Sequence, residues 1–363
     1  MRKALSLAQE GVGYVSPNPL VGCVIVGQDG KIVGEGAHHQ FGGPHAEPNA
    51  IADAESNGHT VAGSTAYVTL EPHSHHGKTP PCCDLLIEKR IARCIVAMVD
   101  PNPNVSGEGI RRMREAGILV EVGLLEAEAR ELNRFFIKHI TTGLPYLTLK
   151  VASSLDGRSA LASGESKWIT SEASRKMVHK LRAEHDAVMV GTGTARADDP
   201  ALTVRLVEGR QPRRIVLDPQ LQLPHTLSLL TDEYHEKTIV VTSQQTVETG
   251  GTQVQWLRQQ GVEIIAVPAG DGRLDLNALL KKLGDQGISS IVVEAGPTLA
   301  ASIVHNKLFD EMQLFVAPLF LGAESRPSIG GLSIHSLASA VRYSYVSIDK
   351  VEDSLDFLVR VRV

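Results

Sequence analysis

Apolar segments of two kinds alternate along the first part of the chain. Short runs rich in apolar and β-branched residues are typical of buried strands, and they are VGCVIV, STAYVTL and RCIVAMV. Longer segments with apolar residues three or four apart are typical of helices, and they are AEPNAIADAES, CDLLIEKR and EAEARELNRFFIKHI. This alternation predicts an α/β domain.

A break in the pattern at TTGLP, residues 141–145, separates this part from a second one, because glycine and proline interrupt the helical periodicity there. The strand patterns that follow are spaced by helical segments, and they are YLTLKVASSL, AVMVGTG, RRIVLD, TIVVTS, EIIAVPA, SIVVEAG, EMQLFVAPLFLG and DFLVRVRV. The sequence therefore predicts two α/β domains, residues 1–143 and 144–363, which a length of 363 residues also favours.

Composition and charge favour an enzyme that acts on a small molecule. The chain is 42% hydrophobic and 21% charged, and it has no apolar run near the roughly 18 residues of a membrane helix. Its first residues, MRKALSLAQEGVG, are typical of an amphipathic helix and not of a secretory signal, so we expect a cytoplasmic protein. A net charge of -5 argues against a broad nucleic-acid-binding face.

Histidines and cysteines gather in two short segments, GGPHAEPNAI and VTLEPHSHHGKTPPCCDLL. A catalytic zinc ion takes three nitrogen or sulfur ligands from the protein and keeps a fourth position for water. Zinc deaminases follow the pattern H-x-E and later P-C-x-x-C, in which the glutamate carries protons. His45 and Glu47 supply the first half, whereas His73 stands where the first cysteine of the second half is expected, nine positions before Cys82.

Longer motifs extend this likeness over most of the chain. In the first domain SPNPLVGCVIV, GGPHAEPNAI, LEPHSHHGKTPPC and DPNPNVSGEG resemble motifs of the bifunctional deaminase-reductase family of riboflavin biosynthesis. In the second domain the motifs similar to that family are LKVASSLDGRSA, SGESKWIT, LRAEHDAV, TARADDPALTVR, VEAGPTLA and DEMQLFVAPLFLG. The resemblance implies a cytidine-deaminase-like three-layer α/β domain, followed by a dihydrofolate-reductase-like α/β domain.

For the first domain the resemblance implies a zinc-dependent pyrimidine deaminase. Zinc-bound hydroxide would attack the ring carbon that bears the amino group, and a glutamate would pass a proton to the departing ammonia. The residues implied are His45, His73 and Cys82 as zinc ligands, Glu47 as the proton carrier, and Asn18, His75, Lys78 and Thr79 as substrate contacts.

His73 is a departure, because the family has cysteine at that position. Imidazole binds zinc at about 2.0–2.1 Å and thiolate at about 2.3 Å, so the exchange keeps a ligand but changes its reach and charge. Two interpretations stay open: a working site with two histidines and one cysteine, or a reductase whose deaminase domain is impaired by His73 and by Pro48 after the glutamate. Cys83 is expected to be a small buried residue.

The second domain has only weak phosphate-binding signals of its own. Gly191 and Gly193 form a G-x-G without the third glycine of a dinucleotide-binding turn. The segment VVEAGPTLAASI leads a buried strand through Glu294 and Gly296 into a helix, whose first N–H groups suit a phosphate. Without a motif around them, Trp168 would be expected in the core and Arg182 in an ion pair on a helix surface.

The resemblance gives these residues a common role in an NADPH-dependent reductase. Hydride transfer to the first carbon of a ribose phosphate would open the sugar to a ribityl chain. The implied substrate contacts are Ser166, Arg182, Leu202, Arg205 and Glu294, with the two arginines at the phosphate. The implied NADPH contacts are Ala152, Trp168, Thr194, Asp198 and the turn from Gly296. The expected partners are a phosphorylated pyrimidine and further copies of the chain in a homo-oligomer, whereas a nucleic-acid-editing deaminase is disfavoured by the acidic balance and the reductase motifs.

Overall fold

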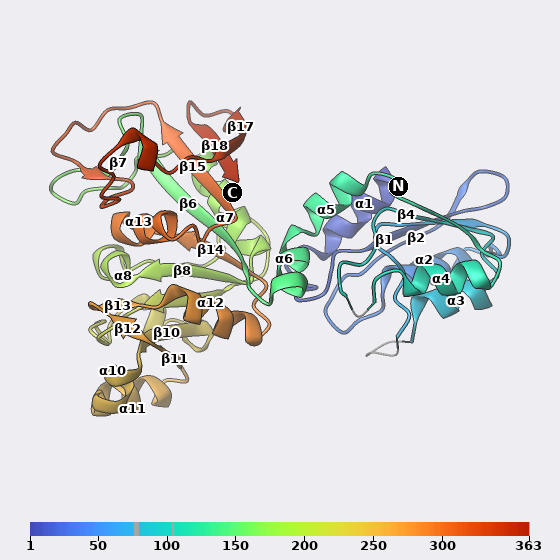
Figure 1. Ribbon diagram of the computed structural model, residues 1–363, viewed down its shortest axis with the longest axis horizontal. Coiled ribbons are helices and arrows are strands. Elements are labelled where there is room, and N and C mark those ends of the chain that lie inside the picture. The colour runs from blue at the N-terminus through green and yellow to red at the C-terminus, as the bar shows by residue number, and fades with distance from the viewer. Residues whose placement is uncertain (76–79, 104, 363) are drawn as a thin grey trace. The chain divides into compact units, whose positions relative to one another are not determined.

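The computed structural model describes residues 1–75, 80–103 and 105–362, and it divides into two compact units, Met1–Leu144 and Pro145–Val363 (Figure 1). Within the described ranges, no helix has both the length and the apolar character needed to cross a bilayer.

The first unit is built on a five-stranded sheet in the order β2-β1-β3-β4-β5. β1 runs antiparallel to β2 and β3, whereas β3, β4 and β5 are parallel. The strands are β1 (Gly22–Val26), β2 (Ile32–Ala37), β3 (Thr65–Val68), β4 (Arg93–Val96) and β5 (Leu119–Val122). The helices are α1 (Arg2–Ala8), the 3-10 helix η1 (Gln9–Gly11), α2 (Ala46–Ser56), α3 (Cys82–Glu88), α4 (Glu108–Glu115), α5 (Glu126–Leu132) and α6 (Arg134–Thr142).

Apolar side chains bury both faces of this sheet. One core cluster joins α2, α3 and α4 to the sheet, and its residues include Ala50, Leu86 and Met113. A second cluster contains Leu5 of α1 and Ala129 of α5. Figure 1 shows these two groups of helices on opposite sides of the strands. The three-layer α/β architecture expected for this domain is therefore confirmed.

Glycines on β2 let helix α2 lie directly against the sheet. A Cβ atom at Gly36 would stand 2.3 Å from the Ala50 backbone nitrogen and 2.4 Å from the Ala46 carbonyl oxygen. No other residue fits at such a distance. This close packing fixes the start of α2, where two of the predicted site residues lie.

The segment EAEARELNRFFIKHI forms two helices where the pattern predicted one. They are α5 and α6, and Asn133 stands between them. The Asn133 side chain accepts a hydrogen bond from the Leu20 backbone N–H (2.8 Å) and donates one to the Leu20 carbonyl (3.0 Å). A contact far away in the sequence thus interrupts a helix that local periodicity favours.

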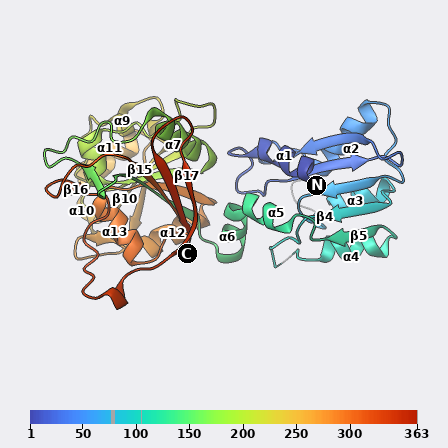
Figure 2. The same ribbon diagram turned by 90° about the horizontal axis from the view of Figure 1, so that it is seen from above.

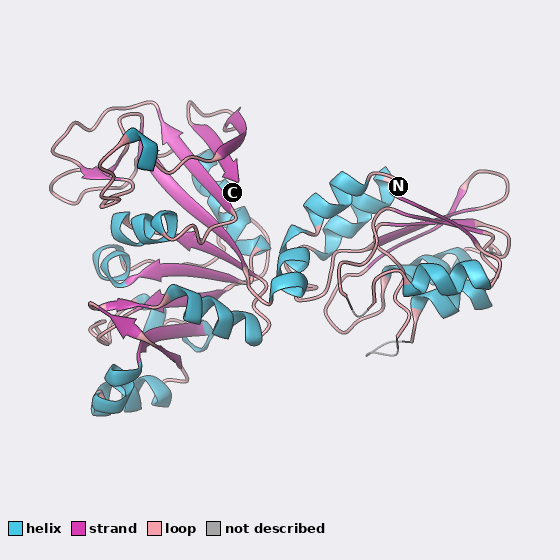
Figure 3. Ribbon diagram, in the orientation of Figure 1, coloured by secondary structure: helices cyan, strands magenta, loops and turns pink. Residues whose placement is uncertain are grey.

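The second unit is built on a nine-stranded sheet in the order β11-β10-β9-β8-β14-β6-β15-β18-β17. Figure 3 draws the strands in magenta and the helices around them in cyan. Neighbouring strands are parallel from β11 to β15, and the last two pairs are antiparallel. The strands of this sheet are β6 (Tyr146–Ser154), β8 (Ala187–Gly191), β9 (Arg213–Leu217), β10 (Thr238–Ser243), β11 (Glu263–Val267), β14 (Ser290–Glu294), β15 (Glu311–Ala317), β17 (Ser344–Lys350) and β18 (Phe357–Arg362). Two small ribbons pair β7 (Arg158–Ala160) with β16 (Arg326–Pro327), and β12 (Ala269–Gly270) with β13 (Arg273–Leu274).

Helices cover both faces of this sheet as well, and Figure 2 shows α7 and α9 on one face and α12 and α13 on the other. The α-helices are α7 (Glu172–Glu184), α8 (Thr192–Asp198), α9 (Ser228–Thr231), α10 (Gln244–Thr249), α11 (Gly251–Gln259), α12 (Leu276–Asp285) and α13 (Pro297–His305), with 3-10 helices η2 (His235–Lys237) and η3 (Leu337–Ser339). A mainly parallel sheet between two helical layers brings the carboxyl ends of its strands to one edge, where ligands of such folds bind.

Candidate functional site

The three predicted zinc ligands come together in the first unit. His45 is the N-cap residue of α2, His73 lies in the loop after β3, and Cys82 is the first residue of α3. One ligand atom from each lies within 4.8 Å of the other two. The His45 Nδ1 atom is 3.6 Å from the Cys82 sulfur, and the rings of His45 and His73 are centred 4.5 Å apart. Two imidazoles and one thiol at these distances are a donor set that fits zinc.

Burial controls the charges in this cluster. Burial, followed by the positive charge of His73, lowers the pKa of His45 to about 4, so this imidazole is neutral at neutral pH, as a metal ligand must be. Burial and the carboxylate of Glu47 raise the pKa of the Cys82 thiol above its ordinary value. A thiolate at Cys82 therefore requires a nearby cation, which a zinc ion would provide.

Glu47 lies beside the three ligands on the first turn of α2. It is 3% exposed, its pKa is raised by burial, and its carboxyl group shares a hydrogen bond with the Cys82 side chain. A carboxyl group with a raised pKa suits proton transfer near neutral pH.

Pro48 does not disturb the helix that carries Glu47. It is the third residue of α2, and Asn49 after it donates to the His45 carbonyl (3.3 Å). The first N–H groups of a helix have no partner within it, so proline at this position removes no helical hydrogen bond.

Other predicted residues flank the cluster. Asn18 Nδ2 is 3.1 Å from His38 Nε2, and the His38 ring is centred 5.1 Å from that of His45. The rings of His75 and His73 are centred 5.5 Å apart. Lys78 and Thr79 lie outside the described residues. Cys83 is fully buried in the core cluster of the unit. Sequence reasoning missed His38, whose signal is its position seven residues before His45 in the same loop.

Glu71 is a second missed residue, and it fixes the loop that carries His73. Glu71 is 3% exposed, and its carboxylate accepts hydrogen bonds from four backbone N–H groups. The donors are Asp100 (3.1 Å), Gly107 (2.9 Å), Gly109 (2.9 Å) and Ile110 (3.2 Å). Glu71 therefore joins the end of β3 to the start of α4, two residues before a predicted ligand.

Replacing Glu71 by glutamine is expected to destabilise the first unit by about 2 kcal/mol or more, because an amide NH₂ group would face N–H donors and leave them unpaired. The measurement is urea unfolding followed by hydrogen exchange in peptides of that unit, since both tryptophans, Trp168 and Trp256, lie in the other. Glu108→Gln is the control, because this exposed glutamate pairs with Arg111 on the surface. Equal stability of the two variants would show that the Glu71 contacts contribute little.

In the second unit, charged groups converge at the carboxyl end of β14. The Arg182 Nε and Nη2 atoms donate to the two carboxylate oxygens of Glu294 at 2.5 and 2.9 Å. Lys150 on β6 is the register partner of Glu294 and was missed by sequence reasoning, since a lysine within a strand gives no distinct signal. Burial opposes ionisation of Glu294, but Arg182 and Lys150 overcome it and lower its pKa to about 2.

This cluster carries more positive than negative groups. Arg205 is exposed as a whole, but partial burial of its charged group, followed by the charge of Arg182, lowers its pKa. Burial and the two arginines lower the pKa of His179 to about 4. His179 is therefore neutral at neutral pH. The cations of the cluster are Arg182, Arg205 and Lys150, and Glu294 is the one carboxylate among the groups that shift their pKa values. The excess of positive charge favours binding of an anion such as a phosphate.

The remaining predicted substrate residues lie in two irregular segments. Leu202 is 2% exposed, with a φ of 53°, in the loop after α8. Ser166 and Trp168 lie in the segment between β7 and α7. Trp168 is 64% exposed, and the Arg175 guanidinium carbon stands 4.4 Å from its ring centroid. Trp168 therefore lies at the surface, whereas a tryptophan considered without the family motif was expected in the core.

Four of the predicted NADPH residues lie on a strand or a helix or at a helix cap. Ala152 is on β6, Thr194 and Asp198 are on α8, and Gly296 is the N-cap residue of α13. A Cβ atom at Gly296 would stand 2.9 Å from the Thr194 hydroxyl oxygen. Within the described residues no side chain caps α13, and its first residue, Pro297, has no N–H, so N–H groups that could meet a cofactor phosphate begin at Thr298.

Comparisons with known proteins agree with this arrangement. Residues 1–98 match the family model described as "Cytidine and deoxycytidylate deaminase zinc-binding region", and residues 145–354 match the "RibD C-terminal domain". The chain is 45% identical to the riboflavin biosynthesis protein RibD of Escherichia coli, covering 97% of this chain and 95% of that protein. It is 43% identical to RibD of Aquifex aeolicus over 98% of this chain and 96% of the relative.

Solved structures give the same result. RibD of Acinetobacter baumannii superposes with a TM-score of 0.88 at 37% identity, covering 99% of this chain and 97% of that one. The Thermotoga maritima diaminohydroxyphosphoribosylaminopyrimidine deaminase/5-amino-6-(5-phosphoribosylamino)uracil reductase superposes with a TM-score of 0.87 at 37% identity, covering 100% and 97%. Both units of the chain are thus matched together, in one relative, over nearly their full length.

Proposed function

Because the chain belongs to the RibD family of riboflavin biosynthesis, we propose that its two units carry out consecutive steps on one phosphorylated pyrimidine. The chain is a bifunctional enzyme, a deaminase and hence a hydrolase as well as a reductase and hence an oxidoreductase. Its cofactors are Zn²⁺ and NADPH. The substrate we propose is a 2,5-diamino-6-ribosylamino-pyrimidinone 5′-phosphate, in line with the name of the Thermotoga maritima relative.

In the first unit, His45, His73 and Cys82 would hold the zinc ion. When bound, zinc supplies an activated water for attack on the ring carbon that carries the amino group. Glu47 would take a proton from the attacking water and deliver it to the amine, which would leave as ammonia. Asn18, His38 and His75 would orient the ring, and Lys78 and Thr79 are proposed contacts to the rest of the substrate. The observation that carries this proposal is the convergence of the three ligand atoms within 4.8 Å.

In the second unit, Arg182 and Arg205 would bind the substrate phosphate as charge-assisted donors, and Glu294 would hold Arg182 in place. Ser166 and Leu202 would complete the substrate contacts. NADPH, bound along Ala152, Trp168, Thr194, Asp198 and Gly296, supplies the hydride that converts the ribosyl group to a ribityl chain. The protein's own contribution is alignment of the sugar with the nicotinamide.

The reductase-only alternative is not favoured, since the ligand cluster is assembled and Pro48 leaves α2 undisturbed. We propose that the enzyme works in the cytoplasm on small molecules, without nucleic acid or membrane partners, and as a homo-oligomer through its second unit.

The order of the two steps provides the test of this function. The purified chain, given the diaminopyrimidine ribotide without NADPH, is expected to release one ammonia per substrate and to stop at the pyrimidinedione. Addition of NADPH is then expected to give oxidation of one NADPH per ribosyl group. A reductase-only enzyme would release no ammonia and would oxidise NADPH only when it is given the deaminated ribotide. If the enzyme releases no ammonia from the diaminopyrimidine ribotide and also oxidises no NADPH with the deaminated ribotide, the proposal is contradicted for both units.

A further inference from the structure

The loop from Asp199 to Arg205 carries two proposed substrate contacts but has no regular secondary structure. Asp199 and Leu202 in it have positive φ values of 39° and 53°. Residues other than glycine adopt such φ values at a cost, so the surroundings must hold this conformation.

Side chains from outside the loop bind its backbone at four residues. Thr203 accepts a hydrogen bond from Arg182 (2.9 Å), and Arg205 donates its backbone N–H to His179 Nδ1 (3.1 Å). Both of these partners belong to the charged cluster already described. The other two backbone contacts come from residues that the proposed function does not use.

Gln211 is the first of these residues. Its Oε1 atom accepts the Val204 N–H at 2.7 Å, and its Nε2 atom donates to the Val204 carbonyl at 2.7 Å. One side-chain amide thus pairs with both backbone groups of a single residue, as a neighbouring strand would. Arg210 next to it forms an ion pair with Asp186 (2.6 Å), which fixes the segment from which Gln211 projects.

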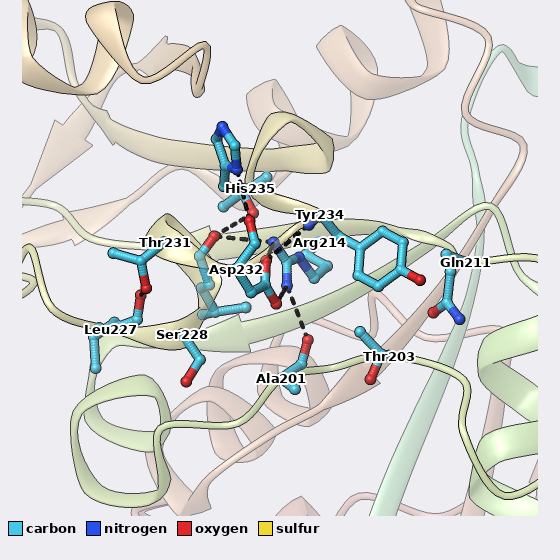
Figure 4. Close-up of polar contacts among 12 residues, drawn as sticks. Ala201, Thr203, Gln211, Arg214, Leu227, Ser228, Thr231, Asp232, Tyr234 and His235 are labelled. Atoms are coloured by element: carbon cyan, nitrogen blue, oxygen red, sulfur yellow. Dashed lines mark hydrogen bonds and ion pairs between the residues drawn. The ribbon is translucent and has the colours of Figure 1, made fainter.

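Arg214 on β9 is the second residue, and Figure 4 shows its guanidinium between Asp232 and the loop. It is 1% exposed, so it cannot reach a ligand in solvent. Its Nη1 and Nη2 atoms donate to the Asp232 carboxylate at 2.6 and 2.8 Å, and Nη1 also donates to the Ala201 carbonyl at 3.1 Å. A buried ion pair with fixed geometry therefore holds the residue just before Leu202.

We propose that Gln211 and Arg214 are positioning residues of the reductase, which hold the loop so that Leu202 and Arg205 meet the substrate. The inference rests on the proposed substrate site, because Gln211 and Arg214 would act only through the loop residues that contact the substrate there. A loop that is held before substrate arrives loses less conformational freedom on binding, which improves affinity. Loss of the Gln211 contacts should therefore act on substrate binding more than on hydride transfer.

The test compares Gln211→Ala with Arg205→Ala in the full-length enzyme. Gln211→Ala is expected to raise the KM for the deaminated ribotide about tenfold, with kcat and the KM for NADPH within about twofold of wild type. Hydrogen exchange of the Val204 amide should become faster in the free enzyme. Gln222→Ala is the control, since Gln222 is exposed and its amide donates to Gln220 on the surface.

Arg214→Lys, which keeps a cation opposite Asp232, is expected to show the same rise in KM; if it does not fold, Gln211→Ala decides the question. An unchanged KM and unchanged Val204 exchange in Gln211→Ala, with a raised KM in Arg205→Ala, would overturn the inference and leave the substrate site intact. An unchanged KM in Arg205→Ala would overturn the substrate site itself.

Discussion

Replacing Glu47 by glutamine is expected to lower the rate of ammonia release by about 10²- to 10⁴-fold, the usual contribution of a general acid and base. The amide has nearly the same shape as the carboxyl group but cannot take and return a proton. Zinc content should stay the same as in wild type, because Glu47 is not one of the three converging ligands. The measurement is ammonia release from the diaminopyrimidine ribotide, together with zinc analysis of the same sample.

Glu55→Gln is a matched control for this prediction, because Glu55 lies on the same helix but is exposed and pairs with Lys89. NADPH-dependent reduction of the deaminated ribotide should be unaffected in both variants, since that reaction belongs to the other unit. Ammonia release at the wild-type rate in Glu47→Gln would assign the proton transfer to a different group.

Replacing Arg205 by alanine is expected to raise the KM for the ribotide in the reductase reaction by about 10- to 100-fold. A hydrogen bond to a charged group contributes about 1.5–3 kcal/mol, and each 1.4 kcal/mol is a tenfold change in affinity. Arg205 is exposed beside Arg182, and its guanidinium has no carboxylate partner among the described ion pairs. Its removal should therefore leave the folded state largely unchanged.

A substrate without its phosphate tests whether the effect of Arg205→Ala comes from a contact with that phosphate. With the dephosphorylated nucleoside, wild type and Arg205→Ala should have similar KM values, because the contact that the variant lacks is already absent. Arg205→Lys keeps the charge and should recover part of the affinity, though not the two-pronged geometry of a guanidinium. An equal loss with both substrates would mean that Arg205 does not contact the phosphate.

Local patterns were sufficient for most of the fold. The strands VGCVIV, STAYVTL and YLTLKVASSL and the helix AEPNAIADAES lie where apolar periodicity predicts them. The exception at Asn133 arises because its side chain binds Leu20, 113 residues away, and no local pattern contains that contact. Strand β2 also escaped prediction, since three of its six residues are glycine or alanine and pack against α2.

The site residues also fall into two groups, those that a sequence motif identifies and those whose partners lie far away in the sequence. His45, Glu47 and Cys82 lie in motifs whose spacing carries the chemistry, and the structure brings the ligands among them together with His73. Glu71 and Lys150 act through partners on other elements, so their roles depend on register and loop closure. Such supporting residues become visible only when the backbone groups and charges around them are placed in space.

The most direct test of the zinc site is X-ray absorption at the zinc edge of the wild type and of His73→Cys, with ammonia release measured on the same samples. We predict about one zinc ion per chain in both proteins, with one sulfur ligand in the wild type and two in the variant, and ammonia release in both. A wild type that binds no zinc and releases no ammonia, with both restored in His73→Cys, would contradict this account and leave a reductase with a disabled deaminase unit.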